Sequence, residues 1–213
     1  MSATLEKRAV IVLGGDDRAR PLVAGLTACG ADTLTITDAA LATQEIAMPA
    51  CAAAGATAGS FDLVVVPVGF AGVDAPGSLE SMDEDRWRTL AEDPLQRVRT
   101  ALQVASTLLR APGGVLVLVL ADFGMGGVAG FTAQSMAAEG ARALGKSVAR
   151  AWLSRGLRVN SLALSAAQIR GARDAKPRPS LDAVARLILL MADADACITG
   201  NTVIADGGER VSV

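Results

Sequence analysis

The chain has 213 residues, of which 51% are hydrophobic and 20% are charged, and its formal net charge at pH 7 is −2. This composition is typical of one soluble globular domain with a substantial core, and the length excludes two full domains. The chain contains no histidine and no tyrosine, which removes the commonest side-chain base, the usual imidazole metal ligand and any phenolic proton donor from its chemistry.

Short apolar runs rich in valine, isoleucine and leucine alternate along the chain with longer segments of helical periodicity. Six of these runs are predicted to be strands, at residues 9–13, 33–37, 63–66, 115–120, 157–162 and 202–205. Nearly all their residues are apolar or β-branched, as expected for parallel strands covered on both faces. The alternation indicates βαβ units. We therefore predict an α/β fold in which residues 1–213 form a single Rossmann-like domain, a doubly wound parallel sheet with helices on both faces.

Three long segments carry apolar stripes at helical spacing. They are predicted to be helices at residues 94–109, 133–153 and 181–191. In the second helix, Leu144, Val148 and Trp152 lie on one stripe, and Ala137 and Ala141 are expected to widen it. Small residues allow helices to approach closely, so this surface is predicted either to pack on the sheet or to meet helices of another subunit.

Helix start signals occur at two further places. Pro21 is suited to the first turn of a helix after the first strand, and Ser180 is expected to cap the helix at residues 181–191. Residues 39–60 and 166–179 lack either periodicity and are predicted to be irregular.

The cysteines and the apolar runs bear on the compartment. Cys29, Cys51 and Cys197 are widely spaced among small residues, which predicts three free, inert thiols in the core of a protein from a reducing compartment. No run approaches the roughly 20 apolar residues of a membrane span, and the first residues lack the apolar core of a signal peptide. A cytoplasmic protein is expected.

Basic residues cluster at Arg86, Arg88, Arg97, Arg99 and Arg110. Aromatic residues make up only 3% of the chain, so the base-stacking platforms of a nucleic-acid surface are missing. These arginines are interpreted as solvated helix faces, and no nucleic-acid partner is expected.

Several motifs carry a family resemblance. The sequence reads ITGNTVIADGG at residues 198–208, RGLRVNS at residues 155–161 and DLVV at residues 62–65, and Trp87 is followed seven residues later by Pro94. These segments are similar to the ITG…DGG, RGIRVN, DxLV and W…NL motifs of the short-chain dehydrogenase/reductase family. The chain thus resembles that family over nearly its whole length. The resemblance implies a Rossmann-like fold and, in active members, hydride transfer with NAD(P).

The resemblance also assigns four positions to the family's catalytic residues. Counted back from Asn160, the tyrosine position falls on Gln134, the lysine position on Ala138 and the serine position on Ala121. The asparagine position falls on Pro94. None of these side chains exchanges a proton near neutral pH, so no catalytic residue is predicted.

An insertion in this helix would change the assignment but not its consequence. Phe131 would then stand at the tyrosine position and Ser135 at the lysine position. Lys146 lies twelve residues beyond Gln134, roughly 18 Å along a helix axis, and cannot replace the missing lysine.

The resemblance places the cofactor site at the turn after the first strand. Gly14 matches the first glycine of the family's TGxxxGxG turn and Gly15 follows it, but the second and third glycines become Arg18 and Arg20. Asp38 stands where NAD-preferring members carry the carboxylate that binds the ribose; a turn-capping role for Asp38 is equally compatible. We expect no cofactor, or NAD if Gly14, Gly15 and Asp38 still bind it.

The chain is also shorter than the family, whose members run to about 250 residues. Between Asp38 and Asp62 there is too little sequence for the usual helix, strand and helix, so a strand on the adenine side is predicted to be lost or retained only as a vestige. The segment between Asn160 and Leu181, the substrate lid in the family, is shortened too. By contrast, the helices that pair subunits in the family are retained.

Three functions remain open from the sequence. The first is a catalytically inactive subunit that assembles with, and stabilises or shapes, a catalytically active relative, with acyl-CoA esters as one candidate substrate class. The second is an NAD(P)-dependent oxidoreductase with unusual groups, for example Asp122 as base and a water held by Gln134. The third is a homo-oligomeric protein that binds a nucleotide or acyl ligand at the carboxyl ends of the strands.

Overall fold

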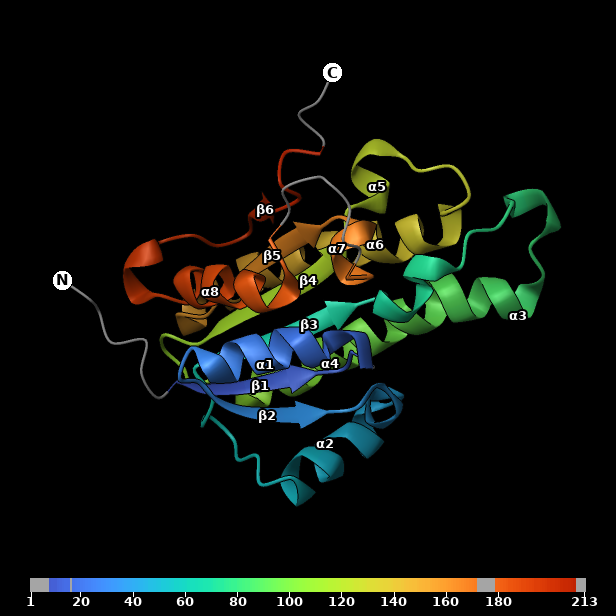
Figure 1. Ribbon diagram of the computed structural model, residues 1–213. Coiled ribbons are helices and arrows are strands. Elements are labelled where there is room, and N and C mark those ends of the chain that lie inside the picture. Colours follow the sequence, from blue (N-terminus) through green and yellow to red (C-terminus); the bar gives the residue numbers. More distant parts are fainter. Residues whose placement is uncertain (1–7, 16, 172–178, 210–213) are drawn as a thin grey trace.

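The computed structural model describes residues 8–15, 17–171 and 179–209. Six parallel strands form one sheet in the order β2–β1–β3–β4–β5–β6 (Figure 1). Their bounds are β1 (Ala9–Leu13), β2 (Asp32–Ile36), β3 (Leu63–Val68), β4 (Val115–Ala121), β5 (Arg158–Leu164) and β6 (Thr202–Ile204). Each strand predicted from the sequence is confirmed to within two residues at either end.

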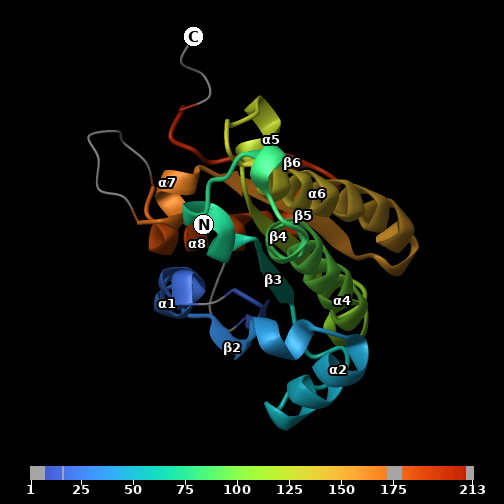
Figure 2. The same cartoon turned by 90° about the vertical axis from the view of Figure 1, so that its right-hand side faces the viewer.

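Helices cover both faces of this sheet. They are α1 (Arg20–Ala28), α2 (Gln44–Ala53), α3 (Glu84–Trp87), α4 (Asp93–Leu108), α5 (Phe123–Gly126), α6 (Thr132–Trp152), α7 (Ala166–Ile169) and α8 (Leu181–Met191). Figure 2 shows α1, α7 and α8 on one side of the sheet and α2, α4 and α6 on the other. The doubly wound Rossmann-like fold expected from the sequence is confirmed, with the three long helices at their predicted places.

Two apolar cores follow from this layering, one on each face. Alternate residues of the central strands point into opposite cores: Val65 and Val117 contribute to the core under α1 and α8, whereas Val64 and Leu116 contribute to the core under α4 and α6. Every residue of β3 and β4 is buried. This explains why these strands read as continuous apolar runs rather than as alternating patterns.

The segment between β2 and β3 departs from the sequence prediction. Residues 39–60 were expected to be irregular, but they contain a 3-10 turn at Asp38–Leu41 and the helix α2. Alanine is the best helix former, and here it outweighs Pro49 in the helix interior. Residues 37–62 form no strand, which confirms the predicted loss of a strand next to β2.

The other segment predicted to be irregular, residues 166–179, contains the short helix α7, which a capping box between Ser165 and Gln168 starts. Residues 172–178 of that segment lie outside the described residues. Ser180 stands at the N-cap of α8 as predicted, although its side chain makes no capping hydrogen bond.

The alanines of α6 and the cysteines require two corrections. Ala137 and Ala141 are buried in the molecule and do not widen an exposed surface. Their small side chains face inward and allow α6 to approach the sheet closely.

Cys51 is buried, and burial raises the pKa of its thiol. Cys29 is partly exposed, while Cys197 is exposed on the surface turn that follows α8, so the prediction of three core thiols was wrong for Cys197.

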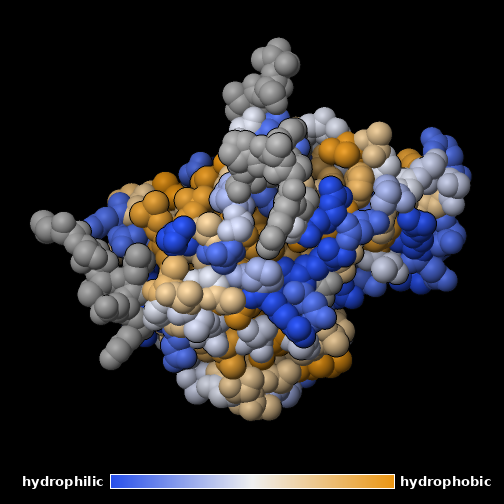
Figure 3. Space-filling model, viewed as in Figure 1, coloured by the Kyte–Doolittle hydropathy of each residue, from blue (hydrophilic) through white to orange (hydrophobic). Residues whose placement is uncertain are grey.

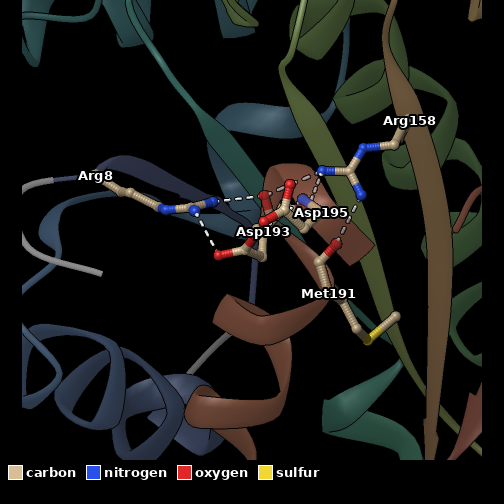
Figure 4. A network of polar contacts seen from close by, with 6 residues as sticks. Arg8, Arg158, Met191, Asp193 and Asp195 are labelled. Atoms are coloured by element: carbon tan, nitrogen blue, oxygen red, sulfur yellow. Dashed lines mark hydrogen bonds and ion pairs between the residues drawn. The ribbon is translucent and has the colours of Figure 1, made fainter. Parts of the chain in front are cut away.

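The carboxyl end of α8 is held by two arginines (Figure 4). Arg158 of β5 donates to the carbonyls of Met191 at 3.2 Å and of Asp193 at 2.7 Å. Arg8 bonds the Ala192 carbonyl and pairs with the Asp193 carboxylate at 3.5 Å. These cations satisfy carbonyls that a helix end leaves without partners. Burial lowers the pKa of Arg158, so the carbonyls and Asp193 compensate a partly desolvated charge.

No helix in the described part of the chain is both long enough and apolar enough to cross a membrane.

The contact between α1 and α8 depends on Gly25. A β-carbon at Gly25 would lie 2.5 Å from the backbone oxygen of Asp182 and 2.6 Å from its Cα. Backbone atoms cannot move aside as the tip of a side chain can. We therefore expect Gly25→Ala to lower the free energy of unfolding by about 1–3 kcal/mol, even though alanine is the better helix former by about 1 kcal/mol.

Urea denaturation measures this change, with Gly140→Ala in α6 as the matched control. There the new β-carbon would meet only the side chain of Leu95, at 3.1 Å, which can shift. The control is expected to change the free energy by less than about 1 kcal/mol. Equal losses in the two variants would contradict the close α1–α8 packing.

Candidate functional site

Two cavities open at the carboxyl ends of the strands. The first, called here the switch-point cavity, has a volume of about 330 Å³ and lies beyond β1 and β3, where the strand order reverses. Among its lining residues are Gly15, Asp38, Pro67, Thr89 and Arg97. Ligands of open α/β sheets bind in the crevice at such a reversal. The cavity is therefore the leading candidate binding site.

The second cavity lies beyond β4 and β5 and has a volume of about 400 Å³. Asp122 and Ser165 line it from the ends of these strands, together with Arg170. Two of its walls are Phe123 and Phe131, whose rings stack at 4.4 Å between centroids. This cavity combines an aromatic wall with charged groups.

The predicted cofactor residues come together at the switch-point cavity. Gly14 and Gly15 both adopt positive φ, +86° and +81°, which glycine accepts without strain. The Oδ1 atom of Asp38 accepts the Gly15 N–H at 2.9 Å. A β-carbon on Gly14 would lie 2.5 Å from this Oδ1, and one on Gly15 would lie 2.8 Å from Pro67 Cγ. The chain's own side chains therefore already require both glycines.

Gln134, assigned by resemblance to the tyrosine position, is 5% exposed. Its Nε2 donates to the carbonyl of Gly72 at 3.1 Å and to that of Ala75 at 2.8 Å. The Oε1 atom is buried and has no partner among the described residues. Ala121 and Ala138, at the assigned serine and lysine positions, are buried in the core. These side chains support the packing of the crevice and offer no acid or base.

Two residues at the start of α4, Pro94 and Arg97, lie at the switch-point cavity. Pro94, at the asparagine position, lines the switch-point cavity at the start of α4. Arg97 also lines this cavity and is partly buried, so it differs from an arginine on a fully exposed helix face. Arg97 lies one helical turn after Pro94 and therefore faces the same cavity.

Asp122 and Gln134, the pair considered for an unusual dehydrogenase, do not share a site. Asp122 is 6% exposed and lines the second cavity, which Gln134 does not line. Both donor protons of the Gln134 amide are used by backbone carbonyls. The arrangement does not support Gln134 as a holder of a water next to Asp122.

An ion-pair bridge that the sequence does not indicate joins three segments near the carboxyl ends of the strands. The turn η3 (Phe70–Asp74) follows β3, and its Asp74 pairs with Arg18 of the turn η1 (Asp17–Ala19) and, at 3.7 Å, with Arg170 beyond α7. Arg170 also donates to the Val73 carbonyl at 3.0 Å. The first pair joins residues 56 positions apart, so no local pattern could have indicated it.

The model for the family described as enoyl-(acyl carrier protein) reductase matches residues 6–188. The chain belongs to the short-chain dehydrogenase/reductase family. A curated relative, trans-4-hydroxycyclohexanecarboxylate dehydrogenase from Sinomonas cyclohexanicum, is 29% identical over 171 residues, which cover 74% of this chain. The match spans 65% of the relative's own length.

The fold likeness extends further than the sequence likeness. The crystal structure of FabI from Alistipes finegoldii superposes with a TM-score of 0.76 and covers 97% of this chain and 92% of its own, at 15% identity. At this identity the match supports the fold alone.

Members of this family typically bind NAD(P), but the residues at the glycine turn do not fit a dinucleotide. Asp38 and Pro67 crowd Gly14 and Gly15, since a β-carbon on these glycines would lie 2.5 Å from Asp38 Oδ1 and 2.8 Å from Pro67 Cγ. Arg18 and Arg20, which stand where the family's turn has its second and third glycines, are paired with Asp74 and Asp17. No step of a reaction is therefore assigned to a nicotinamide cofactor in this chain.

The role of Gln134 is testable by exchanging its amide for a carboxyl of the same shape. Gln134→Glu would place a carboxylate oxygen against the carbonyls of Gly72 and Ala75. We expect a loss of about 2–4 kcal/mol in the free energy of unfolding at pH 7. Burial raises the pKa of the introduced carboxyl, so stability relative to wild type should fall as pH rises above about 4.3.

Chemical denaturation between pH 4 and pH 8 measures this dependence, with Gln103→Glu on the exposed side of α4 as the control. The control should track the wild type throughout. A Gln134→Glu variant as stable as the wild type at pH 7 would show that the amide does not hold η3.

Proposed function

We propose that this chain is a catalytically inactive family member that assembles with a catalytically active relative and stabilises or shapes it. One observation carries the proposal: the amide of Gln134 is bonded to the backbone of η3 at the place assigned to the catalytic tyrosine. No tyrosine or histidine exists anywhere in the sequence to replace it. A protein that keeps the fold but lacks a proton relay can act through contact with another chain.

Exposed apolar side chains support a partner surface. Leu190 on α8 is 62% exposed, and Ile204 on the edge strand β6 is 45% exposed. In the view of Figure 3, hydrophobic residues gather on the left of the molecule, where Figure 1 shows α8. The outer edge of β6 pairs with no other described strand, and exposed edges and apolar patches are common places for chains to associate.

The α6 helix supports the same proposal less strongly. Met136 of α6 is 37% exposed, and Leu153, directly after the end of α6, is 56% exposed. The alanines predicted to widen this face, Ala137 and Ala141, point inward instead. Packing within the chain therefore accounts for most of the apolar residues of α6. We assign the partner contact to α8 and β6.

The substrate of the active partner is proposed from the comparisons. The matching family model is named after a reductase of acyl-carrier-protein substrates, which favours an acyl thioester. The relative is named for trans-4-hydroxycyclohexanecarboxylate, a ring carboxylate. Carboxylates and acyl thioesters share the carboxyl-derived group, and we propose an acyl thioester as the substrate of the complex.

Native purification without crosslinking, followed by native mass spectrometry, tests the assembly. We expect a stoichiometric complex with a relative that carries a Tyr-x-x-x-Lys motif. Leu190→Glu should weaken this complex by about tenfold or more, because it places a charge in an apolar contact. Ile46→Glu is the control, since Ile46 is 51% exposed on α2, away from α8 and β6. A homo-oligomer without any relative would overturn the proposal.

Activity of the isolated chain is the second test. We expect no steady consumption of NADH or NADPH with a panel of ketones and enoyl thioesters, because a missing proton relay alone forfeits about 10²- to 10⁴-fold in rate. Absorbance at the nicotinamide band measures it. Turnover that follows the protein through purification would establish an oxidoreductase with unusual groups instead.

A further inference from the structure

The walls of the switch-point cavity contain few side-chain hydrogen-bond donors. Of the side chains that line it, only those of Thr89 and Arg97 carry donor protons. The Thr89 hydroxyl donates to the carbonyl of Asp85 at 2.8 Å, so its proton is already used. The guanidinium of Arg97 forms no hydrogen bond or ion pair with any described residue. The side-chain donors that remain for a ligand therefore belong to Arg97.

A carboxylate lines the same cavity, yet Arg97 does not pair with it. Asp38 lies in the turn after β2, and its Oδ1 accepts the Gly15 N–H at 2.9 Å. If the Asp38 carboxylate turned toward Arg97, this partly buried N–H would lose its partner, which costs free energy. The cavity therefore presents one positive and one negative group that belong to separate elements.

Apolar side chains form much of the remaining wall. Leu41, Val66, Leu90 and Val98 line the cavity, and all four are buried. The cavity volume of about 330 Å³ is at the lower end of the range for small-molecule sites. This space suits a compact apolar body, and opposite charges attract more strongly beside such walls than in water.

The two charges determine which ionic group fits. A guanidinium binds a carboxylate through two parallel N–H···O bonds, which fix its orientation as well as its position. Asp38 disfavours a second negative charge in the same cavity, because like charges repel more strongly beside apolar walls than in water. A phosphate monoester carries roughly −1.5 to −2 charges at pH 7, more than one arginine neutralises. The chemistry therefore favours a single carboxylate.

We propose that the switch-point cavity binds a monocarboxylic acid with an apolar body. The carboxylate lies on the Arg97 guanidinium, and the apolar body lies among Leu41, Val66 and Val98. Asp38 is a specificity-determining residue, because its charge disfavours acids with a second anionic group. This inference concerns a site within the chain itself, goes beyond the proposed function and does not depend on a partner subunit.

Isothermal titration of the full chain with three probes of equal carbon number tests the ligand class. Octanoate carries one carboxylate, 1-octanol carries none, and suberate carries one at each end. We expect octanoate to bind at least about tenfold more tightly than either of the others. The reason is that 1-octanol cannot pair with Arg97, while suberate brings a second negative charge into the cavity with Asp38.

Variants at position 97 test the carboxylate contact. Arg97→Gln should weaken octanoate binding by at least about tenfold and leave 1-octanol binding within about twofold. Arg97→Lys keeps the charge but loses the paired donors, so its affinity should lie between those of the wild type and Arg97→Gln. Arg99→Gln is the matched control, because Arg99 is exposed on the same helix and does not line the cavity. It should behave as the wild type.

Asp38→Asn tests the selection against a second anion. The asparagine oxygen can still accept the Gly15 N–H, while the negative charge is lost. The preference for octanoate over suberate should therefore fall by about threefold or more. An unchanged preference would contradict this role of Asp38.

Two further results would overturn the proposal. The first is a wild-type protein that does not bind octanoate, or that binds 1-octanol equally well. The second is an equal octanoate affinity in Arg97→Gln and Arg99→Gln, both verified as folded by circular dichroism, because Arg97 would then not hold the carboxylate.

Discussion

The parallel sheet must be covered on both faces, and the rest of the structure depends on this constraint. Every side chain of β3 and β4 is buried, and burial of each such side chain contributes about 1.5–3 kcal/mol. Helices are therefore required on each side, and they leave only the ends of the strands open. The candidate sites lie at the carboxyl ends because the two faces are already occupied by α1 and α8 or by α4 and α6.

At that edge, the turn η3 follows β3 directly, and Gln134, Arg18 and Arg170 each bind it. The exposed ion pairs of such a bridge contribute at most about 1 kcal/mol each. The buried amide of Gln134 contributes more, so it does more than the arginines to fix the position of η3.

The sequence predicted the sheet well, because buried parallel strands are continuous apolar runs that few other structures share. It missed α2 because Pro49 and a run of small residues conceal the helical pattern. Gly14, Gly15 and Asp38 were found at their turn, since the spacing of that turn is local. The bridge at Asp74 was not found, because its two partners, Arg18 and Arg170, come from distant segments whose proximity depends on the strand order.

The arrangement around Gln134 also determines what a tyrosine could do at this position. An amide nitrogen has two protons, and both are used, one by Gly72 and one by Ala75. A tyrosine at the same position would have one phenolic proton, so it could serve only one of these carbonyls. To free that proton for a substrate, η3 would have to leave the crevice. A Gln134→Tyr substitution therefore exchanges stability for a group that cannot reach a substrate, and Ala138 and Ala121 would still lack the lysine and serine functions. A catalytic site of the family's type would require the turn, the amide and the buried alanines to change together, whereas the proposed partner contact on α8 and β6 requires none of these changes.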